Sequence, residues 1–399
     1  MSGFLFVVPP LVGHINPAVG VAAQLVVRGH RVAWVCPDAA LLRRLAGSEA
    51  RVYPCAGTVE GERPADLRGA EALKFLWEWF LVPLAEAMAP GVRGAVDDFR
   101  PDVVVADQQA FAGALVAERL GLPWATSATT SAEFGGAYDG IPKVAEWLRA
   151  RLAELRDRIG DPTGTADPRF SPYLTLAFTT PELAGSTDQM TVRHVGPSIS
   201  ERPVADGFPW EWLDPSRERV LVSLGTANAD VGGRFLAECV AAVRERAHRV
   251  QALVADPGGT LPPATDDKDI LILPSLPQLP LLERVDAVVC HAGHNTVCEA
   301  LWHGVPLVVA PIRDDQPVIA GQVVEAGAGI RVRFGRVTAQ RLGEALDTVL
   351  YEPGPRTAAA RIRTAFRAAG GAPVAATHLE DLAVDSRFRS LNDEVKPPA

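Results

Sequence analysis

The chain has 399 residues, a net charge of −9 and only five, widely spaced cysteines. This length exceeds one ordinary core and predicts two domains, while scattered arginines and lysines offer no basic surface for nucleic acid. No apolar run reaches the length of a membrane span and the first residues enter a strand without a signal-peptide pattern, so we expect a cytoplasmic protein with reduced thiols and no stable membrane insertion.

The first half of the chain alternates apolar runs with helical stretches, which is typical of a doubly wound parallel sheet. Residues 4–8 are apolar and lead into Gly13-His14-Ile15-Asn16-Pro17. Asn16 as N-cap and Pro17 as first helical residue predict a helix start there, which would leave His14 on the loop at the strand tip. A later buried strand, residues 101–107, ends in Asp107.

A cleft for an apolar molecule is predicted between an aromatic helix and a small-residue segment. Residues 70–88 are apolar almost all round a helix, more than a stripe facing a sheet requires, although a long core helix is the alternative. Residues 126–139 are rich in small polar side chains and precede an amphipathic helix. The side chains expected to line this cleft are Phe75, Trp77, Trp79, Phe80, Phe134 and Tyr138.

A second set of alternating strands and helices follows a proline-containing segment without periodicity. We expect an N-terminal domain that contains this cleft (residues 1–200), a linker (201–215) and a C-terminal domain (216–372). Residues 373–390 are expected to form a helix that packs back on the first domain, and residues 391–399 a disordered tail. The predicted architecture is α/β, with two Rossmann-like domains facing across a cleft.

The most informative pattern begins where an apolar run stops at His291, crosses Gly293 and resumes at helical spacing, which predicts a strand turning into a helix. The backbone amides of Gly293, Asn295 and Thr296 would then point outward at the helix start. Free N–H groups and the positive end of the helix dipole bind phosphate. His291 could donate a further hydrogen bond to the same anion.

A second strand in this region ends in Asp315 and Gln316, which should lie beside the phosphate because parallel strand tips open into one crevice. The turn formed by Ser223, Gly225 and Thr226 is expected to face the same diphosphate. Cys290, His291 and His294 have a spacing that straddles a strand end and a turn, so a zinc site is not favoured. We expect no metal and no cofactor.

These motifs resemble the donor signature of the family 1 glycosyltransferases, which have the GT-B fold. The matching segments span about forty residues and are Pro277-Gln278, His291-x-Gly293-x-Asn295-Thr296-x-x-Glu299, Gly304-Val305-Pro306 and Pro311-x-x-x-Asp315-Gln316. The resemblance implies that Asp315 and Gln316 bind sugar hydroxyls and that Glu299 binds the ribose. Main-chain groups of Leu276 could pair with the base, and Gln278 belongs to the same donor motif.

The resemblance also implies a catalytic base. Gly13-His14-x-Asn16-Pro17 matches the family's base motif, and Asp107 stands in the place of its carboxylate partner. An imidazole works near neutral pH, and a carboxylate on its other nitrogen fixes the tautomer. The alternatives are a loop histidine that caps the helix and an N-cap aspartate. Ser275 replaces the tryptophan that stacks on the base in plant members, so uridine is not assured and thymidine is favoured.

The resemblance is closest to bacterial enzymes that glycosylate polyketides and other natural products. It implies an inverting, metal-independent hexosyl- or deoxyhexosyltransferase that moves a sugar from a TDP- or UDP-sugar to a hydroxyl of an apolar small-molecule aglycone. The alternatives are a nucleotide-sugar epimerase, a lipid-linked sugar transferase on the same fold, or a catalytically silent nucleotide-sugar-binding helper. The aglycone, the sugar, the glycosylated atom and the oligomeric state, a homodimer included, stay open.

Overall fold

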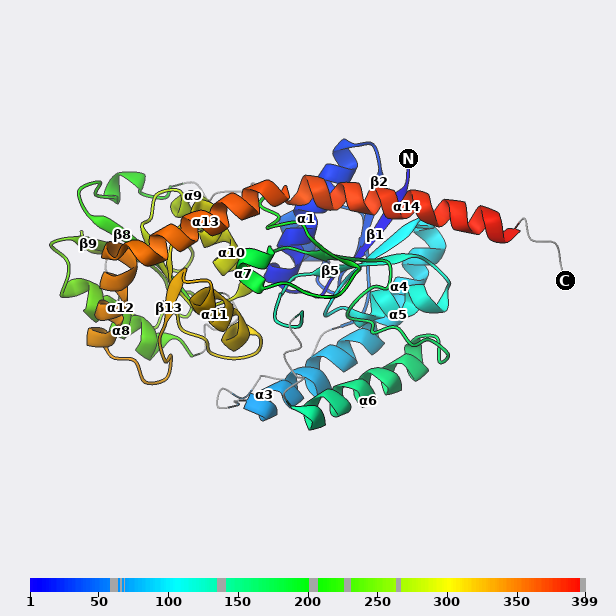
Figure 1. Cartoon of the computed structure of the whole chain (residues 1–399), viewed down its shortest axis with the longest axis horizontal. Helices are drawn as coiled ribbons and strands as arrows, with labels where there is room; N and C mark the ends of the chain where they lie inside the picture. The colour runs from blue at the N-terminus through cyan, green and yellow to red at the C-terminus, as the bar shows by residue number, and fades with distance from the viewer. Residues whose placement is uncertain are drawn as a thin grey trace.

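The computed structural model describes residues 1–57, 64, 67, 69–134, 141–200, 207–225, 231–262 and 267–394, with side chains up to residue 385. The chain forms two α/β lobes that lie side by side (Figure 1). Of the predicted linker, residues 201–206 lie outside the described ranges, and residues 210–212 form a short 3-10 helix. No helix in these ranges is both long and apolar enough to cross a membrane.

The N-terminal lobe holds the first seven strands. Its strands are β1 (Gly3–Val7), β2 (Arg31–Val35), β3 (Val52–Tyr53), β4 (Val103–Asp107), β5 (Trp124–Ala128), β6 (Leu174–Ala177) and β7 (Val192–His194). Its helices are α1 (Val12–Val27), α2 (Ala39–Ala46), α3 (Gly69–Phe75), the π-helix η1 (Leu76–Leu81), α4 (Val82–Phe99), α5 (Phe111–Arg119), α6 (Pro142–Ile159) and α7 (Pro181–Ala184).

The C-terminal lobe repeats the pattern with six strands. They are β8 (Glu218–Ser223), β9 (Val250–Ala255), β10 (Ile270–Leu273), β11 (Ala287–Cys290), β12 (Leu307–Val309) and β13 (Gly329–Arg331). The helices are α8 (Gly233–Arg244), α9 (Gln278–Leu282), α10 (His294–His303), α11 (Gln316–Glu325), α12 (Ala339–Tyr351) and α13 (Pro353–Ala369), and the chain then continues into α14 (Ala372–Glu394).

Both sheets are parallel and reverse their strand order at one point. The orders are β3-β2-β1-β4-β5-β6-β7 and β10-β9-β8-β11-β12-β13, so the reversals fall between β1 and β4 and between β8 and β11. Ligands of such sheets bind outside the carboxyl ends of the strands at this switch point. The two predicted Rossmann-like domains are confirmed. A ligand is therefore expected near the loops that follow β1, β4, β8 and β11.

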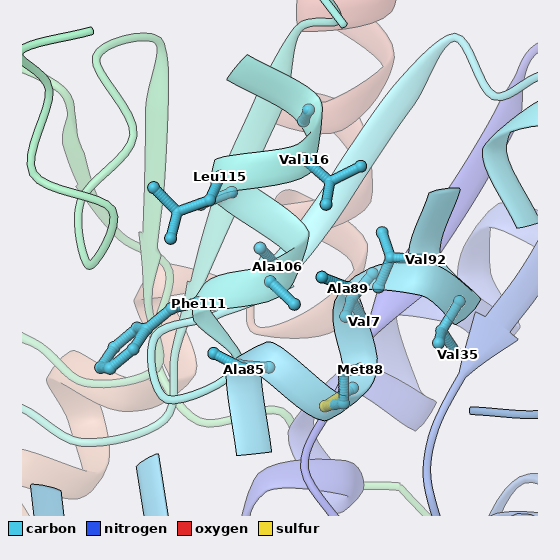
Figure 2. Close-up of a cluster of buried hydrophobic side chains, with 14 of the residues drawn as sticks. Val7, Val35, Ala85, Met88, Ala89, Val92, Ala106, Phe111, Leu115 and Val116 are labelled. Carbon is cyan, nitrogen blue, oxygen red and sulfur yellow. The ribbon is translucent and has the colours of Figure 1, made fainter. Parts of the chain in front are cut away.

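The N-terminal core fixes the tips of β1 and β4. Figure 2 shows Val7 of β1 and Ala106 of β4 among apolar side chains from α4 and α5, including Met88 and Phe111. Gly113 lets α5 approach the sheet closely, since a Cβ there would come within 2.8 Å of the Cβ of Ala106 and 2.9 Å of the Cβ of Val7. This close approach holds the carboxyl end of β4 in place.

The last helix ties the end of the chain to the N-terminal lobe. α13 runs along the C-terminal lobe and α14 continues across the N-terminal lobe (Figure 1), where it packs on α1. Arg28, which follows α1 as its C-cap, donates a 2.7 Å hydrogen bond to Glu380, and the ring of His30 lies 2.8 Å from the other oxygen of that carboxylate. α14 extends to Glu394, into the predicted tail; residues 395–399 are outside the described ranges.

The aromatic helix differs from its prediction. Instead of one helix over residues 70–88, the chain runs through α3, η1 and α4 and ends at Phe99. In the π-helical turn the N–H of Val82 bonds to the carbonyl of Trp77, five residues back. Pro83 follows immediately and has no N–H to offer an α-type bond. π-Helical turns rotate the side chains that follow, and they occur frequently at functional sites.

Candidate active site

His14 and Asp107 meet at the switch point of the first sheet. His14 Nδ1 lies 2.9 Å from Asp107 Oδ1, and Thr129 Oγ1 lies 2.8 Å from the same nitrogen. The Thr129 hydroxyl donates its proton to Asp107 Oδ2 at 3.0 Å. Because a carboxylate only accepts, Nδ1 must carry the ring proton. This accounting leaves Nε2 of His14 as the nitrogen with a free lone pair.

The surroundings of His14 also set its basicity. Burial alone would lower its pKa, but the negative charge and hydrogen bond of Asp107, with a further contribution from Asp315 of the other lobe, hold the pKa above the ordinary value. The side chain is partly open to solvent, whereas that of Asp107 is fully buried. The arrangement suits a base that accepts a proton from a bound molecule.

The loop position predicted for His14 is wrong. α1 begins at Val12 with Leu11 as the N-cap, so His14 lies in the first helical turn and Pro17 lies inside the helix. Since proline has no N–H, the carbonyl of Gly13 lacks its intrahelical partner. The side-chain amide of Asn295, from the other lobe, donates to that carbonyl at 2.8 Å. A tertiary contact therefore permits a helix start that the local pattern did not predict.

The predicted strand-to-helix turn of the C-terminal lobe is confirmed. β11 ends at Cys290, and α10 begins at His294 after an extended Gly293. The amides of His294, Asn295 and Thr296 occupy the first helical turn, where no intrahelical carbonyl is available to them. Ala292 has a φ of 66°, which a residue with a side chain adopts only at a cost. The turn presents these amides to an anion.

The ring of His291 fills a space that only glycines leave open. A Cβ on Gly225 would lie 2.8 Å from the Cε1 atom of His291, and a Cβ on Gly293 would overlap its Nε2 atom. Burial lowers the pKa of His291 to about 4. The charge of Arg313 lowers this pKa further, whereas a hydrogen bond with the Ser223 main chain raises it. His291 is thus neutral near pH 7, so its ring is able to form hydrogen bonds but carries no charge. Thr226 lies outside the described residues.

The predicted sugar-binding pair lies at the start of α11, in which Asp315 is the N-cap and Gln316 the first helical residue. Asp315 Oδ2 accepts a 2.6 Å hydrogen bond from the Thr130 hydroxyl of the N-terminal lobe, and burial raises the pKa of this carboxyl. The side-chain oxygen of Gln316 accepts from the amides of Ile312 and Arg313 at 2.9 and 3.0 Å. Both lone pairs of this oxygen are therefore occupied, and Gln316 has only its amino group, a donor, to offer to another molecule.

Two further predicted donor residues contact each other. Gln278, the first residue of α9, donates to Glu299 of α10 at 2.6 Å. Glu299 is buried and also lines a small pocket between the lobes with Pro17 and Asn295. Leu276 is half-buried between β10 and α9. Within the described ranges no group of three or more acidic, histidine or cysteine side chains is arranged to hold a metal ion.

Comparison with known proteins gives the family. A model described as UDP-glucoronosyl and UDP-glucosyl transferase matches residues 200–365. The demethyllactenocin mycarosyltransferase of Streptomyces fradiae is 30% identical over 404 residues, which cover 96% of this chain and 87% of that protein. The chain belongs to the family 1 glycosyltransferases.

Solved structures agree in fold with this glycosyltransferase. The glycotransferase of kitacinnamycin superposes with a TM-score of 0.79 at 25% identity, covering 96% of this chain and 98% of that one. VinC in complex with dTDP superposes with a TM-score of 0.74 at 22% identity, covering 96% of this chain and 100% of that one. The glycosyltransferase has the GT-B fold that the resemblance implied.

Three hydroxyl side chains follow β5 within the segment predicted to form a wall of the cleft, but none of the three was predicted as a site residue. Thr129 contacts the His14 and Asp107 pair, Thr130 contacts Asp315, and Ser131 Oγ donates to Gln322 of α11 at 2.7 Å. The run begins directly after Ala128, the last residue of β5, which is the neighbour of β4 in the sheet. The position of these three residues at the tip of a central strand is the sequence feature that could have predicted a role in the site. In the glycosyltransferase these side chains connect the N-terminal lobe to the C-terminal lobe.

The aromatic helix of the glycosyltransferase divides into a core residue and a surface residue. Trp77 is 1% exposed and packs on Phe111 and Trp147 with ring centroids 5.3 and 6.3 Å apart, so its predicted cleft position is wrong. Trp79 is 60% exposed, and its ring stacks on Phe75 at 6.0 Å. The π-helical turn between α3 and α4 presents Trp79 outward.

Two of the other predicted acceptor residues lie deeper in the lobe. Phe134 is buried against Phe170 and His194. Phe80 is half-buried against the N-terminal core. Tyr138 lies outside the described residues. Of this set, Trp79 with Phe75 offers the aromatic surface that a ligand of the glycosyltransferase could reach.

Proposed function

We propose that this glycosyltransferase moves a sugar from a nucleoside diphosphate carrier to a hydroxyl of an apolar natural-product aglycone, with inversion and without a metal ion. The observation that carries the proposal is the His14 and Asp107 pair. Because Nδ1 of His14 is bonded to Asp107, its Nε2 is available to accept a proton. Asn295, at the start of α10, is bonded to Gly13, the residue before His14. The base and the donor helix therefore lie next to each other.

The donor half of the site supports a diphosphate with a sugar attached. The amides at the start of α10 and the neutral ring of His291 would stabilise the leaving diphosphate. Asp315 and Gln316 would bind the sugar hydroxyls, and Glu299 with Gln278 the ribose. The exposed Ser275 leaves no aromatic side chain at that position to stack on the base, and the dTDP complex of VinC supports a thymidine carrier.

The acceptor half supports an apolar ring system. The exposed Trp79 and its stacking partner Phe75 would bury such a molecule, and apolar burial contributes about 25 cal/mol per Å². The similarity to the demethyllactenocin mycarosyltransferase supports the natural-product class of the acceptor.

The reaction would be a single displacement. The acceptor oxygen attacks the anomeric carbon and its proton passes to Nε2 of His14, while the bond between that carbon and the diphosphate oxygen breaks with its electrons on the diphosphate. Asp107 stabilises the imidazolium that results. Because attack and departure take place on opposite faces, the anomeric configuration inverts.

The test is transfer to an aliphatic hydroxyl acceptor from thymidine and uridine donors that carry the same sugar. We expect an inverted anomer by NMR, and a loss of roughly a hundred- to ten-thousandfold in kcat for His14→Ala with donor binding retained. Near-full activity of His14→Ala, or a retained anomer, would overturn the mechanism. Conversion of the donor to an epimer without any acceptor would instead identify an epimerase.

A further inference from the structure

A second cavity lies on the C-terminal lobe, between the edge strand β13 and the helix α12. Its volume is about 520 Å³. Small-molecule sites occupy roughly 300–1,000 Å³, so the cavity is large enough for a metabolite. None of its lining residues belongs to the donor site or to the His14 and Asp107 pair.

The cavity is strongly cationic. Arg331, Arg333, Arg336 and Arg341 line it with a single carboxylate, Glu344, which pairs with Arg341 at 2.8 Å. Among the described residues no carboxylate forms an ion pair with the other three arginines. The chain as a whole carries a charge of −9, so this concentration of positive charge runs opposite to the average surface. Cations gathered in a concave site attract and concentrate anions.

The floor of the cavity is apolar. Val332, Val337 and Ala345 line it and are themselves buried. Guanidinium groups bind phosphate oxygens in a bidentate manner, and a planar or aliphatic body can cover an apolar floor. Charged side chains on an edge strand can also serve only to prevent pairing with another strand, but that purpose requires neither a cavity nor an apolar floor.

We propose that this cavity, which we call the arginine groove, is a second anion site. It binds the phosphate group of an organic phosphate, with the apolar part of the ligand against Val332, Val337 and Ala345. The site is independent of the donor diphosphate site. It would be occupied together with the donor.

Calorimetry of the full chain with inorganic pyrophosphate tests the proposal. We expect the wild type to bind two equivalents of pyrophosphate. In the Arg333→Glu/Arg336→Glu variant the affinity for one of these equivalents should fall at least tenfold. The matched control is Arg43→Glu/Arg44→Glu, which makes the same change in charge at exposed positions of α2 and should keep both equivalents. His291→Ala should weaken the donor-site equivalent and leave the groove equivalent intact.

Arg333→Gln/Arg336→Gln repeats the measurement with a milder change, and retained glycosyl transfer reports that the fold is intact. Unchanged binding in both groove variants would overturn the proposal and leave the arginines as protection of the edge strand. Co-sedimentation with phosphatidic acid vesicles, but not with phosphatidylcholine vesicles, would assign the phosphate to a lipid headgroup if it depends on Arg333 and Arg336. Pyrophosphate binding without sedimentation would assign it to a soluble ligand.

Discussion

Asn295 of the donor lobe donates a 2.8 Å hydrogen bond from its side chain to the carbonyl of Gly13, the residue before the catalytic-base candidate His14. That carbonyl is available because Pro17, four residues later, has no N–H. One side chain thus completes a helix of the opposite lobe, and its backbone amide stands at the predicted phosphate site. The contact joins the start of α10 to the first turn of α1.

The first prediction concerns this contact. Asn295→Ala should lower the free energy of unfolding by about 0.5–1.5 kcal/mol, the net value of a typical hydrogen bond. In a Pro17→Ala background the cost should shrink, because residue 17 then supplies the missing intrahelical N–H. Denaturant unfolding of the four proteins of this double-mutant cycle measures the difference. Equal costs in both backgrounds would show that Pro17 does not create the need for Asn295.

The second prediction concerns pH. The pKa of His14 is held above its ordinary value of about 6.5, and only the neutral ring can accept a proton. The rate should therefore fall with decreasing pH through a midpoint above about 6.5. Asp107→Asn removes the principal influence that raises the pKa, so the midpoint should move to lower pH while the maximal rate drops. A pH profile of kcat/KM that keeps its midpoint in Asp107→Asn would contradict this assignment.

The third prediction concerns the fit of His291. Gly293 has backbone angles that alanine can adopt, so Gly293→Ala should fold, but its methyl group would overlap the ring of His291. We expect donor affinity to fall at least about tenfold, or about 1.4 kcal/mol. In a His291→Ala background the same change should cost little more, since the ring is already absent. Calorimetry with nucleoside diphosphate measures both, and additive losses would refute a shared cause.

The fourth prediction separates the sugar from the nucleotide. Thr130→Val removes the 2.6 Å hydrogen bond to Asp315 and leaves a carboxyl of raised pKa without that partner. Affinity for the nucleotide sugar should fall by roughly 0.5–1.5 kcal/mol, whereas affinity for the bare nucleoside diphosphate should not change. Thr130→Ser keeps the hydroxyl and should restore sugar affinity. Equal weakening of both ligands would mean that Thr130 affects the donor lobe only generally.

The fifth prediction contrasts two tryptophans two residues apart. Trp77→Ala should cost roughly 3–5 kcal/mol of stability, because it empties a packed core position. Trp79→Ala should leave the thermal midpoint nearly unchanged and raise the acceptor KM more than the donor KM. Steady-state kinetics with each substrate varied in turn gives the split. An unaltered acceptor KM would place the aglycone elsewhere.

Local patterns in the sequence carried the fold and much of the site. Hydrophobic runs with alternating helices predict parallel sheets whose strand tips open into one crevice. The resemblance to a known family then paired His14 with Asp107, and the two side chains lie 2.9 Å apart. The turn from β11 into α10 was equally readable, because a strand end, a glycine and a helical period occur within a few residues. Each of these features depends on neighbours in the chain or on general sheet geometry.

Contacts between the lobes could be decided only by the tertiary structure. Asn295 meets Gly13 across 282 positions, and Thr130 meets Asp315 across 185. No periodicity encodes such pairs, since they depend on how two separately folded sheets dock. The sequence did not predict the start of α1 at Val12, because the hydrogen bond that Pro17 cannot give to the carbonyl of Gly13 is supplied by Asn295 of the other lobe. Trp77 and Trp79 were indistinguishable because a helix that is apolar all round does not identify its buried face, which the packing of α5 and α6 determines.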